Sequence, residues 1–488
     1  MMKKNLSNKL SAFITSAGIV FLFTVFFHWL FSKTNLTLHG GIAAAASVLL
    51  AAVIYIQFVP LWLDLWFGER LTSGQKVQCR EENTHQHTAE KMPVYASVKI
   101  SAHPSAKTDV SSKTPPHTYI KIFFALAAYC MAVLVVIFAV RYINGCSHTF
   151  SQSLGVWRET DANHYQDIAM QWYLSEGHWD RLVQLVFLPG YPIAVKLAAL
   201  ITGDYYLAAF AVSIISFSLA GCVFYKLMRL DLSHSDAVRA VKYLCIFPAS
   251  YFFAGPMSES LFLLLCICCI YCIRTDRWFL GCLAGGYAAF TRSLGITLLV
   301  PCIMELVSRA VSADNTASKG IPAKKLVSVP LIPAGFAAYC GINYAVSGNY
   351  FKFMEYQSKH WSQNLGWFFN TASYQTELIA SNWGTNFKII LGLWLPNILM
   401  IFASLAIMAF AVKKLRPCYT AWFIAYFIIA VGATWLLSAP RYLAAMAVLP
   451  MAVSALAKSK RADAAFTVCC IMLNTAYLCA FALRWYVW

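Results

Sequence analysis

The run TYIKIFFALAAYCMAVLVVIFAVRY at 118–142 decides the fold class, because Lys121 and Arg141 are its only charged residues. A helix needs about 20 mostly apolar residues to cross the roughly 30 Å hydrocarbon core of a membrane. Similar runs recur along the chain and predict about thirteen transmembrane helices, within a range of about 11–14. They are 12–32, 41–62, 118–142, 205–226, 243–256, 259–273, 278–290, 294–307, 326–346, 386–411, 418–437, 442–457 and 465–485.

The composition of the 488 residues supports the same fold class. Hydrophobic residues make up 59% and charged residues 12%, whereas soluble domains have about 45–50% and about 25%. Disorder is excluded because apolar and aromatic residues are abundant. The sequence therefore predicts an all-α polytopic membrane protein, and its net charge of +17 does not require nucleic acid as a partner.

Lys and Arg accumulate in cytoplasmic loops, so they indicate the orientation. Lys3, Lys4 and Lys9 place the N-terminus inside. The basic groups of the later loops fall on that same side only if the interrupted apolar stretch 186–201 does not span. This topology leaves two long segments outside, 143–204 and 347–385, and we expect the first to form a juxtamembrane helical loop. The basic groups meant here are Lys226, Arg229, Arg239, Lys242, Arg274, Arg277, Arg309, Lys319, Lys324, Lys325, Lys413, Lys414, Arg416, Lys458, Lys460 and Arg461.

We divide the chain into three parts: a two-helix membrane unit at 1–65, a flexible cytoplasmic linker at 66–117 and the main membrane domain at 118–488. The linker is rich in Ser, Thr, Pro and His and has no helical period. His85 and His87 could form half of a metal site, but we interpret them as part of this solvated linker. The cysteines lie mostly within spans, where free Cys behaves as a small apolar residue.

Polar groups at membrane depth are costly and usually functional. If 161–173 is helical, then Asp161, Tyr165, Ile168 and Trp172 share one face, with the carboxylate at its end. Such a carboxylate can accept a proton from a hydroxyl, although a solvated interfacial helix explains it equally well. Glu259 begins an apolar run. Its negative charge either interacts favourably with the dipole at the N-terminus of a helix or orients a substrate.

Two arginines stand out because they lie on the outer side, against the positive-inside pattern. Arg292 interrupts two short apolar halves, and Arg441 precedes Tyr442 at the outer end of a span. A guanidinium binds phosphate bidentately, so the phosphate of a lipid is one partner; snorkelling or an internal ion pair are the alternatives. No P-loop, dinucleotide fingerprint or His-Glu-x-x-His motif occurs, and without an outside Asp-x-Asp pair no divalent metal or other cofactor is indicated.

Five segments occur in series on the predicted outer side. They are DANHYQDIA (161–169), FLPGYP (187–192), FPASYFFAGPMSESLF (247–262), TRSLG (291–295) and PRY (440–442). Together they resemble the GPI mannosyltransferase II family (PIG-V and its bacterial homologues), within the GT-C membrane glycosyltransferases. The resemblance covers about 118–488. Thr160 and Met257 depart from the family's usual Trp and Tyr, and residues 1–117 are not explained by it.

This resemblance implies a GT-C-like fold in the plasma membrane of a bacterium, with the active site on the outer face. The donor would be a sugar on a polyprenyl phosphate, with mannose as the family default, and the acceptor a glycan, glycolipid or protein. Asp161 would be the general base of an inverting transfer, with Glu259 as the second catalytic carboxylate. The residues implied to bind substrate are His164, Tyr165, Tyr191, Arg292, Arg441 and Tyr442.

Two other classes of function stay open. A transporter or lipid flippase predicts inverted repeats and broken helices at the membrane midplane, and the sequence shows no such internal symmetry. A membrane scaffold, or an acyl- or phosphotransferase that uses the same carboxylate, is the third class. The clustering of polar residues on one side favours the glycosyltransferase.

Overall fold

A computed structural model describes residues 48–54, 56, 117–173, 181–313, 323–364, 366 and 368–487. Within these ranges the regular structure is helical and no extended strand occurs, which confirms the all-α prediction. The first part contains α3 (His117–Ile143), α4 (Phe150–Leu154), α5 (Ala162–Gln171), α6 (Gly190–Thr202), α7 (Tyr205–Arg229), α8 (His234–Ile246), α9 (Glu259–Arg274) and α10 (Trp278–Thr291).

The second part continues from the 3-10 helix η5 (Ser293–Leu298) to the C-terminal helix. Its α-helices of six residues or more are α11 (Leu299–Ala313), α12 (Ala323–Ser328), α13 (Leu331–Ser347), α14 (Lys352–Trp361), α15 (Phe368–Ser381), α17 (Leu395–Ala411), α18 (Pro417–Ala430), α19 (Ala439–Ala444), α20 (Val448–Leu456) and α21 (Lys460–Ala482).

Five helical segments in the described ranges are long and apolar enough to cross a membrane, by length and composition. They support an integral membrane protein. The total of thirteen spans stays a prediction, and the expected spans in 1–65 and the linker 66–117 lie almost entirely outside the described residues. The five segments are His117–Ile143, Tyr205–Arg229, Lys325–Ser347, Phe387–Lys414 and Lys460–Ala482.

The apolar runs 243–256 and 442–457 were expected to be single spans, and each is broken into two helices. In the run 243–256, α8 ends at Ile246 and a 3-10 helix η4 (Ser250–Ala254) follows. Pro248 lies at the break, where its ring and missing N–H oppose a continuous helix. The run 442–457 is divided between α19 and α20. Pro450 falls in the first turn of α20, where proline is tolerated.

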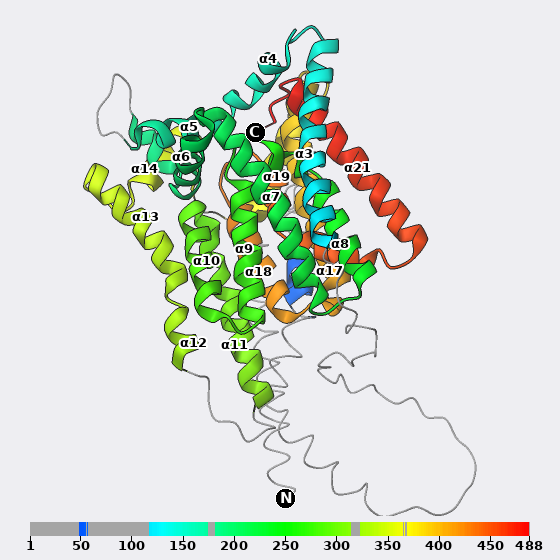
Figure 1. The fold of residues 1–488 in the computed structure, drawn as a ribbon. Helices are drawn as coiled ribbons and strands as arrows, with labels where there is room; N and C mark the ends of the chain where they lie inside the picture. The colour runs from blue at the N-terminus through cyan, green and yellow to red at the C-terminus, as the bar shows by residue number, and fades with distance from the viewer. Residues whose placement is uncertain are drawn as a thin grey trace, which may run out of the picture.

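The described part of segment 143–204, which excludes 174–180, folds as the expected helical loop. It contains α4, the 3-10 helices η2 (Gly155–Glu159) and η3 (Arg181–Val186), α5 and α6. With 13 residues, α6 is about 20 Å long, and the expectation that 186–201 does not span stays a prediction. Figure 1 shows α4, α5, α6 and α14 gathered at one end of the molecule, with α11 and α12 at the other.

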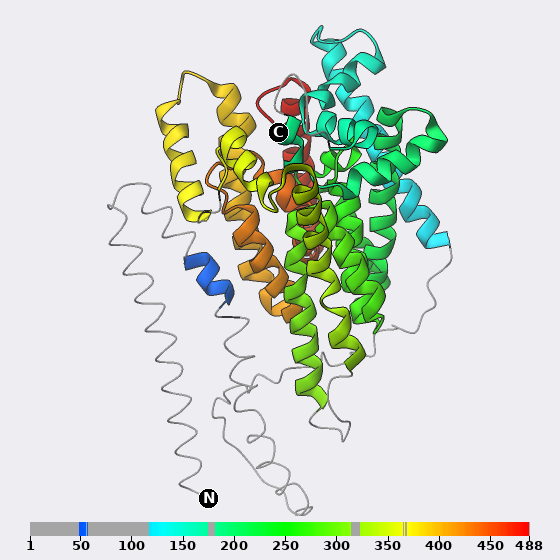
Figure 2. The ribbon, with the colours of Figure 1, turned by 90° about the vertical axis from the view of Figure 1, so that its left-hand side faces the viewer.

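The helices of the membrane domain run between these two ends. α9 packs between α7 and α10, and α10 in turn packs against α13. The turned view in Figure 2 shows that the C-terminus lies at the same end as segment 143–204. We call this the α5 end. Since α9 begins there with Glu259, its last residue, Arg274, lies at the opposite end.

Two glycines let the loops approach the helices at the α5 end. A Cβ on Gly190 would lie 2.3 Å from the Thr291 hydroxyl oxygen, and one on Gly255 would lie 2.3 Å from the Trp157 ring. Any side chain at either position would force the segments apart. Gly190 therefore allows α6 to begin directly against the end of α10, next to Arg292.

Candidate functional site

Four charged side chains from four separate segments meet at the α5 end. Asp161 is the N-cap of α5, Glu259 is the first residue of α9, Arg292 follows α10, and Arg441 lies in α19. The Arg441 Nη2 donates to Asp161 Oδ2 over 2.7 Å, although the two residues are 280 positions apart. We call these four residues the charge quartet.

Glu259 joins the two arginines of the quartet. Its Oε1 lies 2.5 Å from Arg292 Nη1 and 3.1 Å from Arg441 Nε. The side chain of Glu259 is 1% exposed and that of Arg441 6%, whereas Asp161 is 27% exposed. With all four groups ionised the two positive and two negative charges balance, and this makes their burial tolerable.

The internal ion pair foreseen for the outward arginines is therefore present for both. The two carboxylates differ in their role within the quartet. Glu259 is enclosed and holds both guanidinium groups, so it suits an orienting role. Asp161 is the accessible carboxylate, and its Oδ1 makes no hydrogen bond to any residue in the described ranges. Of the two, only Asp161 can offer an oxygen to a molecule that arrives from outside.

Aromatic rings enclose the guanidinium groups. The Arg441 guanidinium carbon lies 5.3 Å from the centre of the Tyr442 ring and 5.8 Å from that of Phe252. The Arg292 guanidinium carbon lies 5.4 Å from the Tyr442 ring. Tyr442 thus contacts both arginines, and such cation–π contacts favour retention of the positive charge.

Ser258 connects the quartet to α5. Its hydroxyl accepts from Arg292 Nη1 over 3.0 Å and lies 2.9 Å from the Tyr165 hydroxyl. Tyr165 is therefore part of the site through Ser258. The sequence prediction omitted Ser258. Its position beside Glu259, inside the segment 247–262, could have indicated that it belongs to the site.

Tyr191 lies behind Tyr165 and is fully buried. Its hydroxyl donates to the Ala209 carbonyl over 2.8 Å and lies 2.9 Å from the Ser213 hydroxyl, so its polar group is occupied within the protein. The ring contacts Tyr165 edge-on at 5.3 Å between centres. In this structure Tyr191 supports Tyr165, and its direct contact with a substrate stays a prediction.

His164 lies beside the quartet on α5. Its ring stacks on Phe187 with 4.4 Å between centres, and its Nδ1 is buried with no hydrogen-bond partner among the described residues. Burial lowers the pKa of His164, and the nearby carboxylates of Asp161 and Asp167 oppose this effect only in part. His164 is therefore a neutral ring at pH 7, able to make hydrogen bonds without adding charge.

The site contains no set of metal ligands. Among the described residues, no group of three or more His, Cys, Asp and Glu side chains is arranged to hold a metal ion. The quartet provides instead two carboxylates, two guanidinium groups and the hydroxyls of Ser258 and Tyr165. These can accept a proton and bind an anion.

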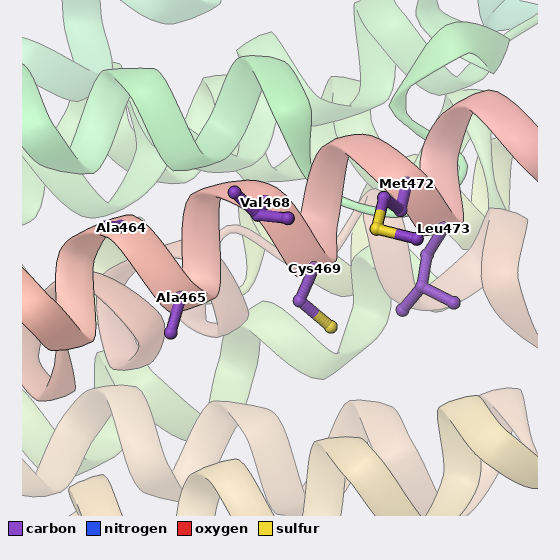
Figure 3. Close-up of a pocket in the computed structure, with 6 residues that line it drawn as sticks. All are labelled: Ala464, Ala465, Val468, Cys469, Met472 and Leu473. Carbon is purple, nitrogen blue, oxygen red and sulfur yellow. The ribbon is translucent and has the colours of Figure 1, made fainter.

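A groove of about 540 Å³ lies elsewhere, on the face of α21 (Figure 3). Small and apolar side chains of α21 line it, including Val468, Cys469 and Met472. Val468 and Met472 belong to the exposed apolar surface of a helix that can span a membrane. Contact with lipid tails explains such a face, so we do not assign the groove to the site.

Comparisons with known proteins add little to this geometry. No family model matches the chain, and no curated protein matches it. Among solved structures the chain is similar to ArnT from Cupriavidus metallidurans bound to undecaprenyl phosphate, with a TM-score of 0.43 and 13% sequence identity over 76% of each chain. A likeness of this size carries no argument about fold or activity, so the functional proposal rests on the site.

Proposed function

We propose that this protein is a GT-C-type glycosyltransferase that moves a sugar, mannose in the first instance, from a polyprenyl phosphate to an acceptor hydroxyl. The transfer takes place at the α5 end, which we place on the outer face of a bacterial plasma membrane. The acceptor is a glycan, a glycolipid or a protein. The proposal needs no metal or other cofactor.

One observation carries this proposal. Four of the five segments that resemble the GPI mannosyltransferase II family supply the charge quartet, and they lie far apart in sequence. The remaining segment, 187–192, supplies Phe187 and Tyr191, which contact Tyr165. If the five segments resembled the family only by coincidence, they would not be expected to lie together at one end of a helical membrane protein.

The chemistry follows from the positions of the two carboxylates. Asp161 accepts the proton of the acceptor hydroxyl through its accessible oxygen. The acceptor oxygen forms a bond to the anomeric carbon, while the bond from that carbon to the phosphate oxygen breaks on the opposite face. The products are the inverted glycoside and the polyprenyl phosphate, which keeps the bonding electrons.

The arginines stabilise the leaving phosphate as its negative charge grows. Arg292 uses Nη1 for Glu259 and Ser258, and its other guanidinium nitrogens make no hydrogen bond to a described residue. It can therefore bind phosphate without leaving Glu259. Arg441 binds Asp161, so a phosphate that attracts Arg441 would also free Asp161 and increase its basicity.

The test is sugar transfer by purified protein in membranes supplied with labelled polyprenyl-phosphate mannose. Wild type should transfer the label and Asp161→Asn should not. Other polyprenyl-phosphate sugars are tested in parallel. If one of them is the donor, the proposed sugar is replaced and the proposed class of reaction is kept. Absence of transfer from every such donor would reject the glycosyltransferase proposal. Movement of labelled lipid across the membrane without transfer would favour the flippase.

A further inference from the structure

The short segment that precedes α19 is held by side chains from two other helices. The backbone N–H of Leu436 donates to the Tyr374 hydroxyl over 3.0 Å, and its carbonyl accepts from Gln375 Nε2 over 2.8 Å. Both side chains come from α15. Because Leu436 lies five positions before Arg441, this anchorage controls where α19 begins.

Asn397 of α17 holds the same segment at two points. Its Nδ2 donates to the Leu436 carbonyl over 3.0 Å, and its Oδ1 accepts from the Ala439 N–H over 2.8 Å. A carbonyl can only accept and an N–H can only donate, so the two bonds determine the orientation of the amide. Asn397 is fully buried, and a buried amide of this kind is costly to leave without partners.

Ala439 is the first residue of α19, and its backbone N–H has no partner within the helix. The N-cap residue Ser438 makes no capping hydrogen bond with its side chain, and Pro440 has no N–H. Asn397 therefore acts as the N-terminal cap of α19 from another helix. Caps of this type stabilise a helix end, and this matters most for a helix as short as the six residues of α19.

Asn397 is itself placed by an unusual turn. The π-helical segment η6 (Ile390–Trp394) directly precedes α17. A π turn contains more residues than an α turn, so it rotates the side chains that follow it relative to those before it. Such turns are rare and occur frequently at functional sites. Here the turn is followed within three residues by the amide that caps α19.

We propose that Asn397 is a positioning residue for Arg441, and this rests on the proposed function of the quartet. Arg441 lies in α19, only two positions after the N–H that Asn397 caps. Its guanidinium must reach Asp161 and Glu259 at the same time, over 2.7 Å and 3.1 Å. A shift of α19 by a fraction of a turn would break both contacts. Asn397 acts through Arg441 and touches neither substrate nor reacting atoms.

The matched control is Asn343 of α13, which makes the same pair of bonds elsewhere. It is fully buried, its Nδ2 donates to the Tyr339 carbonyl over 3.2 Å, and its Oδ1 accepts from the Phe353 N–H over 3.1 Å. Asn343→Ala should therefore destabilise the protein about as much as Asn397→Ala, without affecting α19. A second test variant, Gln375→Ala, removes one anchor of Leu436 and leaves the Ala439 cap in place.

The experiment measures amide hydrogen exchange in 436–444 and sugar transfer, on the full-length purified protein. We expect Asn397→Ala to speed exchange in this segment at least tenfold and to reduce transfer about tenfold. Gln375→Ala should have a smaller effect on both, and Asn343→Ala should change both by less than twofold. Lowered transfer by Asn397→Ala should come with an undiminished level of protein in the membrane.

Two results would overturn the proposal. Exchange in 436–444 that is unchanged by Asn397→Ala would show that the cap does not hold α19. Faster exchange with wild-type transfer would show that Asn397 supports the fold without positioning Arg441. If wild type itself transfers no sugar, the proposed function fails, and the exchange measurement still decides whether Asn397 holds the helix that carries Arg441.

Discussion

Helix α9 begins and ends in a cluster of arginine and carboxylate groups, and the carboxylate shared by two arginines is more deeply buried in the first cluster than in the second. At its first residue, Glu259 lies in the charge quartet. At its last residue, Arg274 donates to Asp231 over 2.8 Å and to the Tyr419 hydroxyl over 2.7 Å. Arg416 extends this second cluster, which we call the α9 C-terminal cluster, with distances of 3.9 Å to Asp231 and 3.5 Å to Glu305.

The carboxylate that two arginines share separates the two clusters, since Glu259 is 1% exposed and Asp231 25%. In the C-terminal cluster, the side chains of Asp231 and Arg416 are 25% and 37% exposed, so water shares in their solvation. The side chains of Arg274 and Glu305, by contrast, are buried. In the quartet, Glu259 and Arg441 are almost completely buried, while Asp161 is 27% exposed. Because a buried charge is tolerated only when it is paired, removal of the shared carboxylate should matter more in the quartet. The two clusters therefore share residue types and differ in how deeply the carboxylate between two arginines is buried.

The largest expected effect is the loss of sugar transfer in Asp161→Asn. The substitution keeps the size of the side chain and removes the proton acceptor, so transfer should fall about 10²–10⁴-fold. The measurement is the rate of transfer from labelled polyprenyl-phosphate mannose. Asp231→Asn is the control from the C-terminal cluster and should keep the rate within twofold. Equal losses in both variants would contradict the distinction between the clusters.

The next effect concerns stability. Glu259→Gln leaves Arg292 and Arg441 without their shared carboxylate, and breaking a buried ion pair costs about 3–5 kcal/mol. Asp231→Asn, which changes the more exposed of the two shared carboxylates, should cost about 1 kcal/mol. Thermal unfolding of the purified variants measures both. A Glu259→Gln protein as stable as Asp231→Asn would mean that burial does not separate the clusters.

A smaller effect is the pH dependence that His164 contributes. Its pKa is lowered in the folded protein by burial, so below about pH 6.5 the unfolded chain takes up a proton that the folded protein refuses. Stability should therefore fall as the pH decreases through this range, with no contribution above it. His164→Phe keeps a flat ring against Phe187 and removes the titration. The stability of wild type relative to this variant should decrease from pH 7 to pH 5, and a constant difference would contradict the assignment.

The last prediction concerns the orientation of the protein in the membrane, that is, which of the two clusters faces outward. Cys146 is exposed at the α5 end, so a membrane-impermeant maleimide should label it in intact cells. Cys146→Ser should abolish this labelling. Cys79, in the predicted cytoplasmic linker, should react only after the cells are broken open. Labelling of Cys79 and not of Cys146 in intact cells would reverse the orientation and place the quartet inside.

Much of the site was predictable from local sequence. Asp161, Glu259, Arg292 and Arg441 stand out because charge is rare in apolar surroundings, and each lies at the end of a predicted helix. Their partners were not predictable in the same way. The sequence left open whether each arginine binds a lipid phosphate or an internal carboxylate, because nothing local joins Arg441 to Asp161.

The helical fold shows the same division. Apolar runs of sufficient length predicted the long helices α3, α7 and α21, because the cost of exposing backbone groups in a membrane makes such runs helical. The runs 243–256 and 442–457 were predicted as single spans and are broken. Local composition does not reveal how the prolines in and beside them are accommodated by neighbouring helices.

By itself, the sequence determined that this is a helical membrane protein with its unusual charges in a few short segments, since composition and periodicity are local properties. Only the tertiary structure decided that Glu259 joins two arginines, that Asp161 stays accessible and that Asn397 caps the helix of Arg441. Those contacts join residues from distant parts of the chain. Packing of the helices brings them together, and burial then makes their pairing obligatory.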